Sequence, residues 1–194
     1  MSDALDWAGA ALQQGKPAAA GHALAAVPLA EQNTAEYQSS AGALAVSSGK
    51  PVEAEKRYAE ALRFEPEKDV HQYNLAAIQI QSPDPAKRKL GGDSLQRLAE
   101  SGRVQMFARR ALITRLMFEG RFEEALLQSS PLLSDPAVTF PDRLTHLDLL
   151  QRLDRPRVQS AVVQTQAAAT AKPEDVGALV TWKRPAGDAA GALS

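Results

Sequence analysis

Apolar runs rich in alanine and leucine alternate along this chain with short turns that hold most of its twelve prolines. Alanine is the residue that costs least in a helix, and its small side chain lets helix backbones approach closely. The pattern predicts six pairs of helices, the last one incomplete. The first helices of the pairs are predicted at 4–14, 35–47, 70–81, 104–118, 141–153 and 174–183. The second helices are predicted at 17–27, 51–64, 85–100, 122–133, 156–171 and from 186 onward.

A short motif recurs at a fixed distance and indicates internal repeats. The run Gly15-Lys16-Pro17 returns 34 residues later as Gly49-Lys50-Pro51, and Gly120 is followed 34 residues later by Asp154. Glycine ends a helix well because it accepts the left-handed conformation, and proline opens the next helix because its missing N–H has no partner there. A small residue follows each glycine by five positions, and we expect it to lie buried where the two helices of a repeat cross. These small residues are Ala20, Ala54, Ala125 and Ala192.

The second of these repeats, residues 35–68, carries a known pattern of small, aromatic and proline positions. It is formed by Gly42, Ala54, Tyr58, Ala61 and Pro66, and the next repeat opens with the run Tyr73-Asn74-Leu75-Ala76. This pattern resembles the tetratricopeptide repeat family, of which the chain would be a divergent member and a fragment of a larger bacterial protein. The resemblance implies an all-α fold, an α-α superhelix of about five and a half helix–turn–helix repeats. The predicted single solenoid covers 1–194, with repeats at 1–34, 35–68, 69–102, 103–139, 140–172 and an incomplete one at 173–194.

Two places depart from the regular repeat. Gly91 and Gly92 interrupt a predicted second helix, so we expect a kink or break there, with Leu90, Leu95 and Leu98 still facing inward. The sixth repeat stops at Ser194 without a polar capping helix, so we expect this end to be frayed or covered, and the chain to be a piece of a longer protein.

Residues that could carry catalysis are scattered. The three histidines lie in three different repeats with no second ligand at helical spacing, and no phosphate-binding glycine loop or nucleophile elbow is present. The paired carboxylates stand in first turns of helices, where they complement the helix dipole. We therefore predict a protein that is no enzyme and has no catalytic residue, no cofactor and no metal, with the histidines at the surface or in packing roles.

The resemblance also implies where a ligand would bind. In the tetratricopeptide family the first helices line a concave groove that holds an extended peptide, and the matching positions here form the candidate partner-binding groove. One of these helices also carries arginines interleaved with aromatic residues, a combination common in binding hot spots but also in solvated helix faces. We predict that Tyr73, Asn74 and Arg110 point into one shared groove. The groove residues are Glu36, Ser39, Tyr73, Asn74, Ala77, Phe107, Arg110, Thr114 and Met117.

Charge and composition narrow the choice of partner. The net charge is −1, cysteine is absent and no apolar run is long enough to cross a bilayer, so we predict no nucleic acid partner and no membrane insertion of this segment. The leading hypothesis is a scaffold that binds another protein or peptide in its groove. The alternative is a structural spacer or oligomerisation module of a larger, membrane-anchored protein, with self-association through the C-terminal repeat. The compartment stays open between the cytoplasm and the exported part of an anchored protein.

Overall fold

The computed structural model describes residues 3–100, 102–153, 155–169 and 173–183 of the chain. These residues form eleven α-helices and one short 3-10 helix, with no strand among them. The first helices of the repeats are α1 (Asp3–Gln13), α3 (Ala35–Ser47), α5 (Asp69–Gln79), α7 (Gln105–Phe118), α9 (Phe140–Leu153) and α11 (Pro173–Lys183). Their partners are α2 (Pro17–Ala25), α4 (Pro51–Phe64), α6 (Pro85–Leu98), α8 (Phe122–Leu132) and α10 (Arg155–Ala169). The all-α helix-pair prediction is thus confirmed, and the predicted helix from 186 onward lies outside the described residues.

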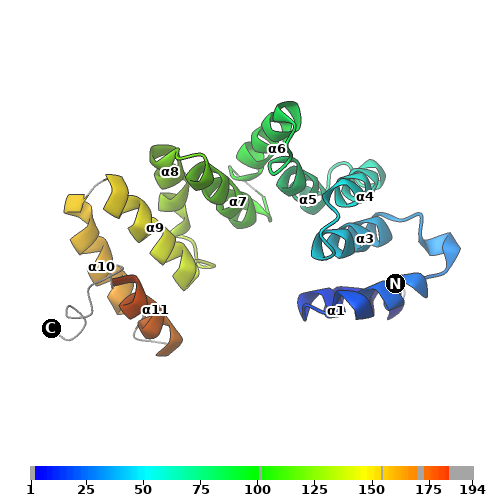
Figure 1. Ribbon diagram of the computed structural model, residues 1–194, viewed down its shortest axis with the longest axis horizontal. Coiled ribbons are helices and arrows are strands. Elements are labelled where there is room, and N and C mark those ends of the chain that lie inside the picture. The colour runs from blue at the N-terminus through cyan, green and yellow to red at the C-terminus, as the bar shows by residue number, and fades with distance from the viewer. Residues whose placement is uncertain (1–2, 101, 154, 170–172, 184–194) are drawn as a thin grey trace. The chain divides into compact units, whose positions relative to one another are not determined.

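The chain divides into two compact units, residues 1–108 and 109–194, and α7 contributes to both. In the first unit α1 packs on α2, α3 on α4 and α5 on α6; in the second, α9 packs on both α8 and α10 (Figure 1). The helices of a pair are joined by turns of a few residues, so they run antiparallel. The organisation of the whole chain as one solenoid stays a prediction.

The same turn joins the two helices of three repeats. Gly15, Gly49 and Gly120 have φ of 67°, 67° and 74°, which is the left-handed region that favours glycine. At the second of these turns the N–H of Lys50 donates to the carbonyl of Ala45 over 2.9 Å, and the N–H of Gly49 donates to that of Val46 over 3.0 Å. These two bonds form a Schellman motif, which pairs helix-end carbonyls that would otherwise lack partners. The repeated Gly-Lys-Pro motif therefore encodes a repeated turn, with Pro17 and Pro51 opening the next helices as predicted.

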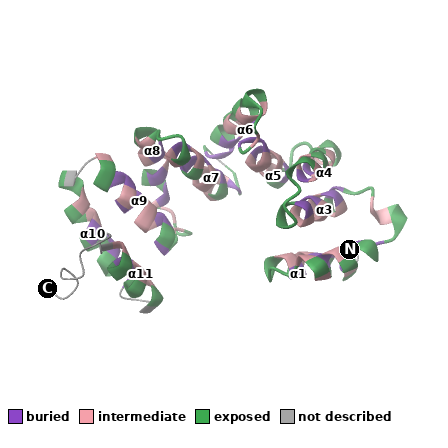
Figure 2. Ribbon diagram, in the orientation of Figure 1, coloured by how far each residue is buried: buried purple, intermediate pink, exposed green. Residues whose placement is uncertain are grey.

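Small residues hold the paired helices close together. Ala54 and Ala125 are fully buried, as predicted for the crossing points. Gly42 on α3 faces the ring of Tyr58 on α4, and a Cβ at residue 42 would lie 2.6 Å from the Cε1 atom of that ring. Tyr58 is buried, and this burial raises the pKa of its hydroxyl to about 12. Buried residues lie mainly along the faces where paired helices meet (Figure 2).

The expectation of a helix break at Gly91 and Gly92 was wrong. Helix α6 continues through both glycines. A Cβ on Gly91 would lie 2.6 Å from the backbone nitrogen of Ile80 and 2.7 Å from the carbonyl oxygen of Ala76, whereas a Cβ on Gly92 would meet nothing within 4 Å. Gly91 is thus the small residue that lets α6 pack against the backbone of α5, and it replaces the alanine found at this contact in other repeats.

The expected inward orientation of the neighbouring leucines holds for two of three. Leu95 and Leu98 are buried, but the Leu90 side chain is 55% exposed. Leu90 immediately precedes Gly91, so when Gly91 faces α5 the helical rotation carries Leu90 to the rim of the contact. A large apolar side chain therefore lies at the surface of the first unit.

Candidate partner-binding site

The predicted groove residues of the first unit lie on α3, α5 and the start of α7. The amide nitrogen of Asn74 donates to the hydroxyl of Ser39 over 3.4 Å, which links α5 to α3. The ring of Tyr73 packs against that of Phe107 with centroids 6.0 Å apart and planes tilted by 53°. Glu36 is exposed on the first turn of α3, and Ala77 is half-buried on α5. Among the predicted groove residues, Ser39 on α3 therefore contacts Asn74 on α5, and Tyr73 on α5 contacts Phe107 on α7.

The predicted groove residues of the second unit gather around an ion pair. Arg110 on α7 grips Asp142 on α9 with two parallel hydrogen bonds, Nε to Oδ1 over 2.9 Å and Nη2 to Oδ2 over 2.7 Å. The same guanidinium also donates to the carbonyl of Ala137 over 3.2 Å. Paired N–H···O bonds of this kind hold a carboxylate in a defined orientation. Arg110 therefore positions α9 relative to α7 inside the protein, a task that the sequence did not predict for it.

Asp142 also caps its own helix. Its carboxylate accepts hydrogen bonds from the backbone N–H and the hydroxyl of Thr139, both over 2.8 Å, and its N–H faces the Thr139 hydroxyl oxygen at 3.4 Å. This reciprocal arrangement is a capping box, with an acidic residue at the third helical position. Burial by itself raises the pKa of Asp142, but the hydrogen bonds from Arg110 and Thr139 outweigh it, so the pKa lies below its ordinary value. Asp142 is thus a carboxylate that stays ionised within the protein.

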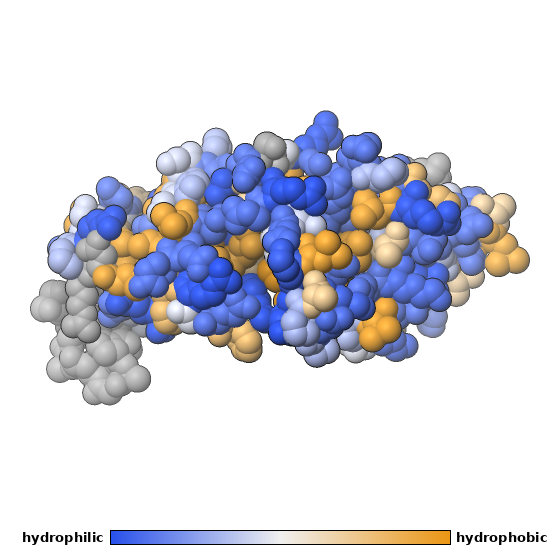
Figure 3. Space-filling view, turned by 90° about the horizontal axis from the view of Figure 1, so that it is seen from above, coloured by the Kyte–Doolittle hydropathy of each residue, from blue (hydrophilic) through white to orange (hydrophobic). Residues whose placement is uncertain are grey.

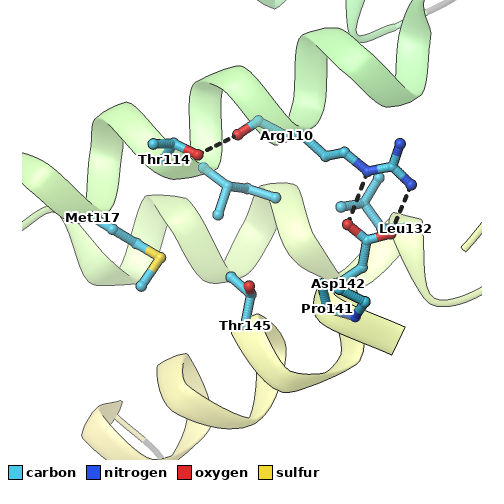
Figure 4. Close-up of a pocket in the computed structure, with 8 residues that line it drawn as sticks. Arg110, Thr114, Met117, Leu132, Pro141, Asp142 and Thr145 are labelled. Atoms are coloured by element: carbon cyan, nitrogen blue, oxygen red, sulfur yellow. Dashed lines mark hydrogen bonds and ion pairs between the residues drawn. The ribbon is translucent and has the colours of Figure 1, made fainter. Parts of the chain in front are cut away.

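A pocket of about 320 Å³ opens beside this ion pair (Figure 4). Its apolar wall comes from α7, α8 and the first turn of α9, and two threonine hydroxyls and the Arg110–Asp142 pair supply its polar groups. The hydroxyl of Thr114 donates to the carbonyl of Arg110 over 2.9 Å, so its oxygen still has acceptor capacity. The residues that line this α7–α9 pocket are Arg110, Ile113, Thr114, Met117, Leu132, Pro141, Asp142 and Thr145.

Three of the nine predicted groove residues, Arg110, Thr114 and Met117, therefore line one pocket. Tyr73 and Asn74 belong to the first unit and Arg110 to the second, so their convergence in one groove stays a prediction. The pocket residues of α9 were not among the predicted groove positions. The run Thr139-x-x-Asp142 signals a capping box and could have located Asp142, but no sequence signal pairs it with an arginine 32 residues away.

The other arginines of α7 also have partners inside the protein. Arg109 donates to the side-chain amide of Gln128 over 3.2 Å. Arg115 pairs with Glu119 over 2.7 Å, and its guanidinium lies 5.4 Å from the centre of the Phe118 ring. The three arginines of α7 thus make contacts within their own helix and its end or with α8 and α9.

The histidines occupy separate places. His71 is buried and its Nε2 lies 2.8 Å from a carboxylate oxygen of Glu65, while Nδ1 of His146 lies 2.8 Å from the hydroxyl oxygen of buried Ser129. His22 is exposed. Among the described residues no group of three or more histidine, aspartate or glutamate side chains lies close enough to hold a metal ion.

In the same part of the chain, no helix is long and apolar enough to cross a membrane.

The helix pairs, the Schellman turns and the small-residue crossings define a tetratricopeptide-like helical repeat fold. Among solved structures, the protein is similar to MamA AMB-1, with a TM-score of 0.61 and 16% sequence identity over 90% of this chain and 94% of that chain. No protein-family model and no curated protein sequence matches the chain.

Proposed function

We propose that this chain is a protein-interaction module that binds a segment of a partner protein, with the α7–α9 pocket receiving an apolar side chain of that segment. The observation that carries the proposal is that Arg110, Thr114 and Met117, predicted as groove positions, line one open pocket. Ile113, Met117 and Leu132 supply apolar surface, and burying apolar area is the main driving force of most protein association.

The polar groups at the pocket suit a peptide rather than a hydrocarbon. The hydroxyls of Thr114 and Thr145 can pair with backbone groups of a bound segment, and the Arg110–Asp142 pair offers fixed dipoles beside the apolar wall. Binding pockets with mainly apolar walls and a few placed polar groups are typical of specific recognition. The proposal assigns the chain no reaction.

The test is peptide selection against the full chain, followed by variants that fill the pocket. Thr145→Trp should weaken a selected peptide by about tenfold or more, since it occupies the volume that the side chain needs. Ser130→Trp, on the exposed face of α8, is the matched control and should leave binding unchanged. Equal affinity of the two variants would refute the pocket as the binding site.

A second candidate function is self-association, as in a spacer or oligomerisation module. It is favoured by exposed large apolar side chains in the first unit, chiefly Trp7 and Leu29. Light scattering on the purified chain decides between the two: a single monomer mass over a wide concentration range would exclude self-association and leave the peptide-binding function.

A further inference from the structure

A second pocket lies in the first unit, formed by α4, α5 and α6 and by residues outside the predicted groove. Its volume is about 300 Å³. Its apolar floor includes Leu62 from the end of α4, Leu75 from α5 and the exposed Leu90 from α6. Figure 3 shows that hydrophobic residues on the face in view form separate groups among hydrophilic ones.

The side-chain amide of Gln79 opens into the same pocket and has no partner in the described part of the protein. The Gln79 residue is only 9% exposed, and its side chain makes no hydrogen bond in the part of the chain that the structure describes. The amide is therefore accessible from the pocket, and a ligand there could take up its hydrogen-bonding groups. The amide of Gln79 therefore offers one donor group and one acceptor, the complement of a peptide backbone unit.

A cation stands at the edge of this pocket. Arg97 is exposed on α6, donates to the hydroxyl of Ser94 over 3.3 Å and has no carboxylate within ion-pair distance among the described residues. Other basic residues of α6 are already engaged: Lys87 pairs with Glu55 and Lys89 with Asp93. The Arg97 guanidinium is thus available at the pocket to bind an anionic group. Its planar set of N–H donors matches the two oxygens of a carboxylate.

The spacing of these groups defines the ligand. Leu90, Ser94 and Arg97 share one face of α6, and Leu90 and Arg97 are seven residues apart, or about 10 Å along the helix. An extended peptide in the polyproline II conformation has three residues per turn, so side chains three residues apart point to the same side and lie about 9 Å from each other. We propose that this α4–α6 pocket binds an extended segment of a partner protein that carries a large apolar side chain and a carboxylate three residues apart. The apolar side chain lies against Leu62, Leu75 and Leu90, the backbone pairs with Gln79, and the carboxylate binds Arg97.

This site is separate from the α7–α9 pocket and adds a second contact to the proposed function. The probes are two acetylated and amidated peptides, Gly-Ser-Leu-Ser-Ser-Glu-Ser-Gly and Gly-Ser-Glu-Ser-Ser-Leu-Ser-Gly, which present the two groups in either order. They are titrated to roughly millimolar concentration into the isotope-labelled full chain, and binding is followed by nuclear magnetic resonance. We expect saturable shifts at the Gln79 side-chain amide and the Leu90 methyl groups. A peptide with lysine in place of glutamate should bind about tenfold more weakly or not at all.

Variants then separate the pocket from the general charge of the chain. Arg97→Glu should weaken the better peptide by about tenfold or more. Lys56→Glu makes the same change of charge at an exposed position of α4 outside the pocket and should leave the affinity unchanged. Leu90→Ser should also weaken binding, and because Leu90 is exposed it should not unfold the protein. No saturable shift with either peptide, shifts confined to the α7–α9 pocket, or equal effects of Arg97→Glu and Lys56→Glu would each overturn the inference. None of these results would affect the test at Thr145.

Discussion

The carboxylate of Asp142 receives the guanidinium of Arg110 from α7 and the capping hydrogen bonds of Thr139 at the start of its own helix. One residue, only 7% exposed, therefore both caps the start of α9 and ties this helix to α7. The wall of the α7–α9 pocket depends on this pair, because Arg110 and Asp142 both line it.

Replacing Asp142 by asparagine should destabilise the protein by about 2 kcal/mol, since it removes the charge that Arg110 and Thr139 both bind. Urea denaturation at neutral pH measures this loss. Glu123→Gln, an exposed carboxylate in the first turn of α8, is the control and should change stability by less than about 0.5 kcal/mol.

The cost of Asp142→Asn should also depend on pH. The folded pKa of Asp142 is depressed, so its contribution is present above its unfolded pKa of about 3.9 and is lost as pH falls through the folded value. The difference between parent and variant should therefore shrink below about pH 4. A difference that stays constant down to pH 2 would contradict the assignment of the ion pair as its source.

The Gly91 and Gly92 pair offers a matched test of helix packing. Gly91→Ala places a Cβ within 2.7 Å of backbone atoms of α5 and should cost roughly 1–3 kcal/mol. Gly92→Ala meets nothing within 4 Å and should stabilise the helix by roughly 0.5–1 kcal/mol. Thermal melts of the two variants should shift in opposite directions, and shifts of the same sign would refute the close contact at Gly91.

The buried alanines give a second packing test. Ala54→Leu and Ala125→Leu should each lose roughly 1–3 kcal/mol, because both side chains are fully buried and leucine overpacks the contact. Ala59→Leu, on the exposed face of α4, is the control. Melting temperatures that match the parent for all three variants would show that residues 54 and 125 do not lie at tight crossings.

His146 should make stability fall in mild acid. Burial, with a smaller effect from the charge of Arg157, lowers its pKa, so the fold favours the neutral ring. The unfolded chain takes up the proton more readily. The contribution of His146 to the free energy of unfolding is therefore fully present above about pH 6.5, and it declines as pH falls from there toward the folded pKa. Urea denaturation at pH 7.5 and 5.5 measures the decline. His146→Asn should reduce it, whereas His22→Asn, at an exposed position, should not.

Much of the fold could be predicted from the sequence because it depends on local rules. The Gly-Lys-Pro turns follow from the left-handed φ of glycine and the missing N–H of proline, and all eleven helices that the structure describes begin within one residue of their predicted starts. The burial of Ala54 and Ala125 followed from the same register.

The tertiary structure decided what each polar side chain contacts. The sequence marked Arg110 as a groove residue, but only the packing of α9 on α7 shows that its guanidinium binds Asp142. The local sequence predicted a helix defect at Gly91, because glycine is unfavourable in a helix. In the structure Gly91 instead allows α6 to contact the backbone of α5. The physical reason is range: helix starts and turns depend on neighbours in sequence, whereas ion pairs, close backbone contacts and pockets depend on which helices pack together.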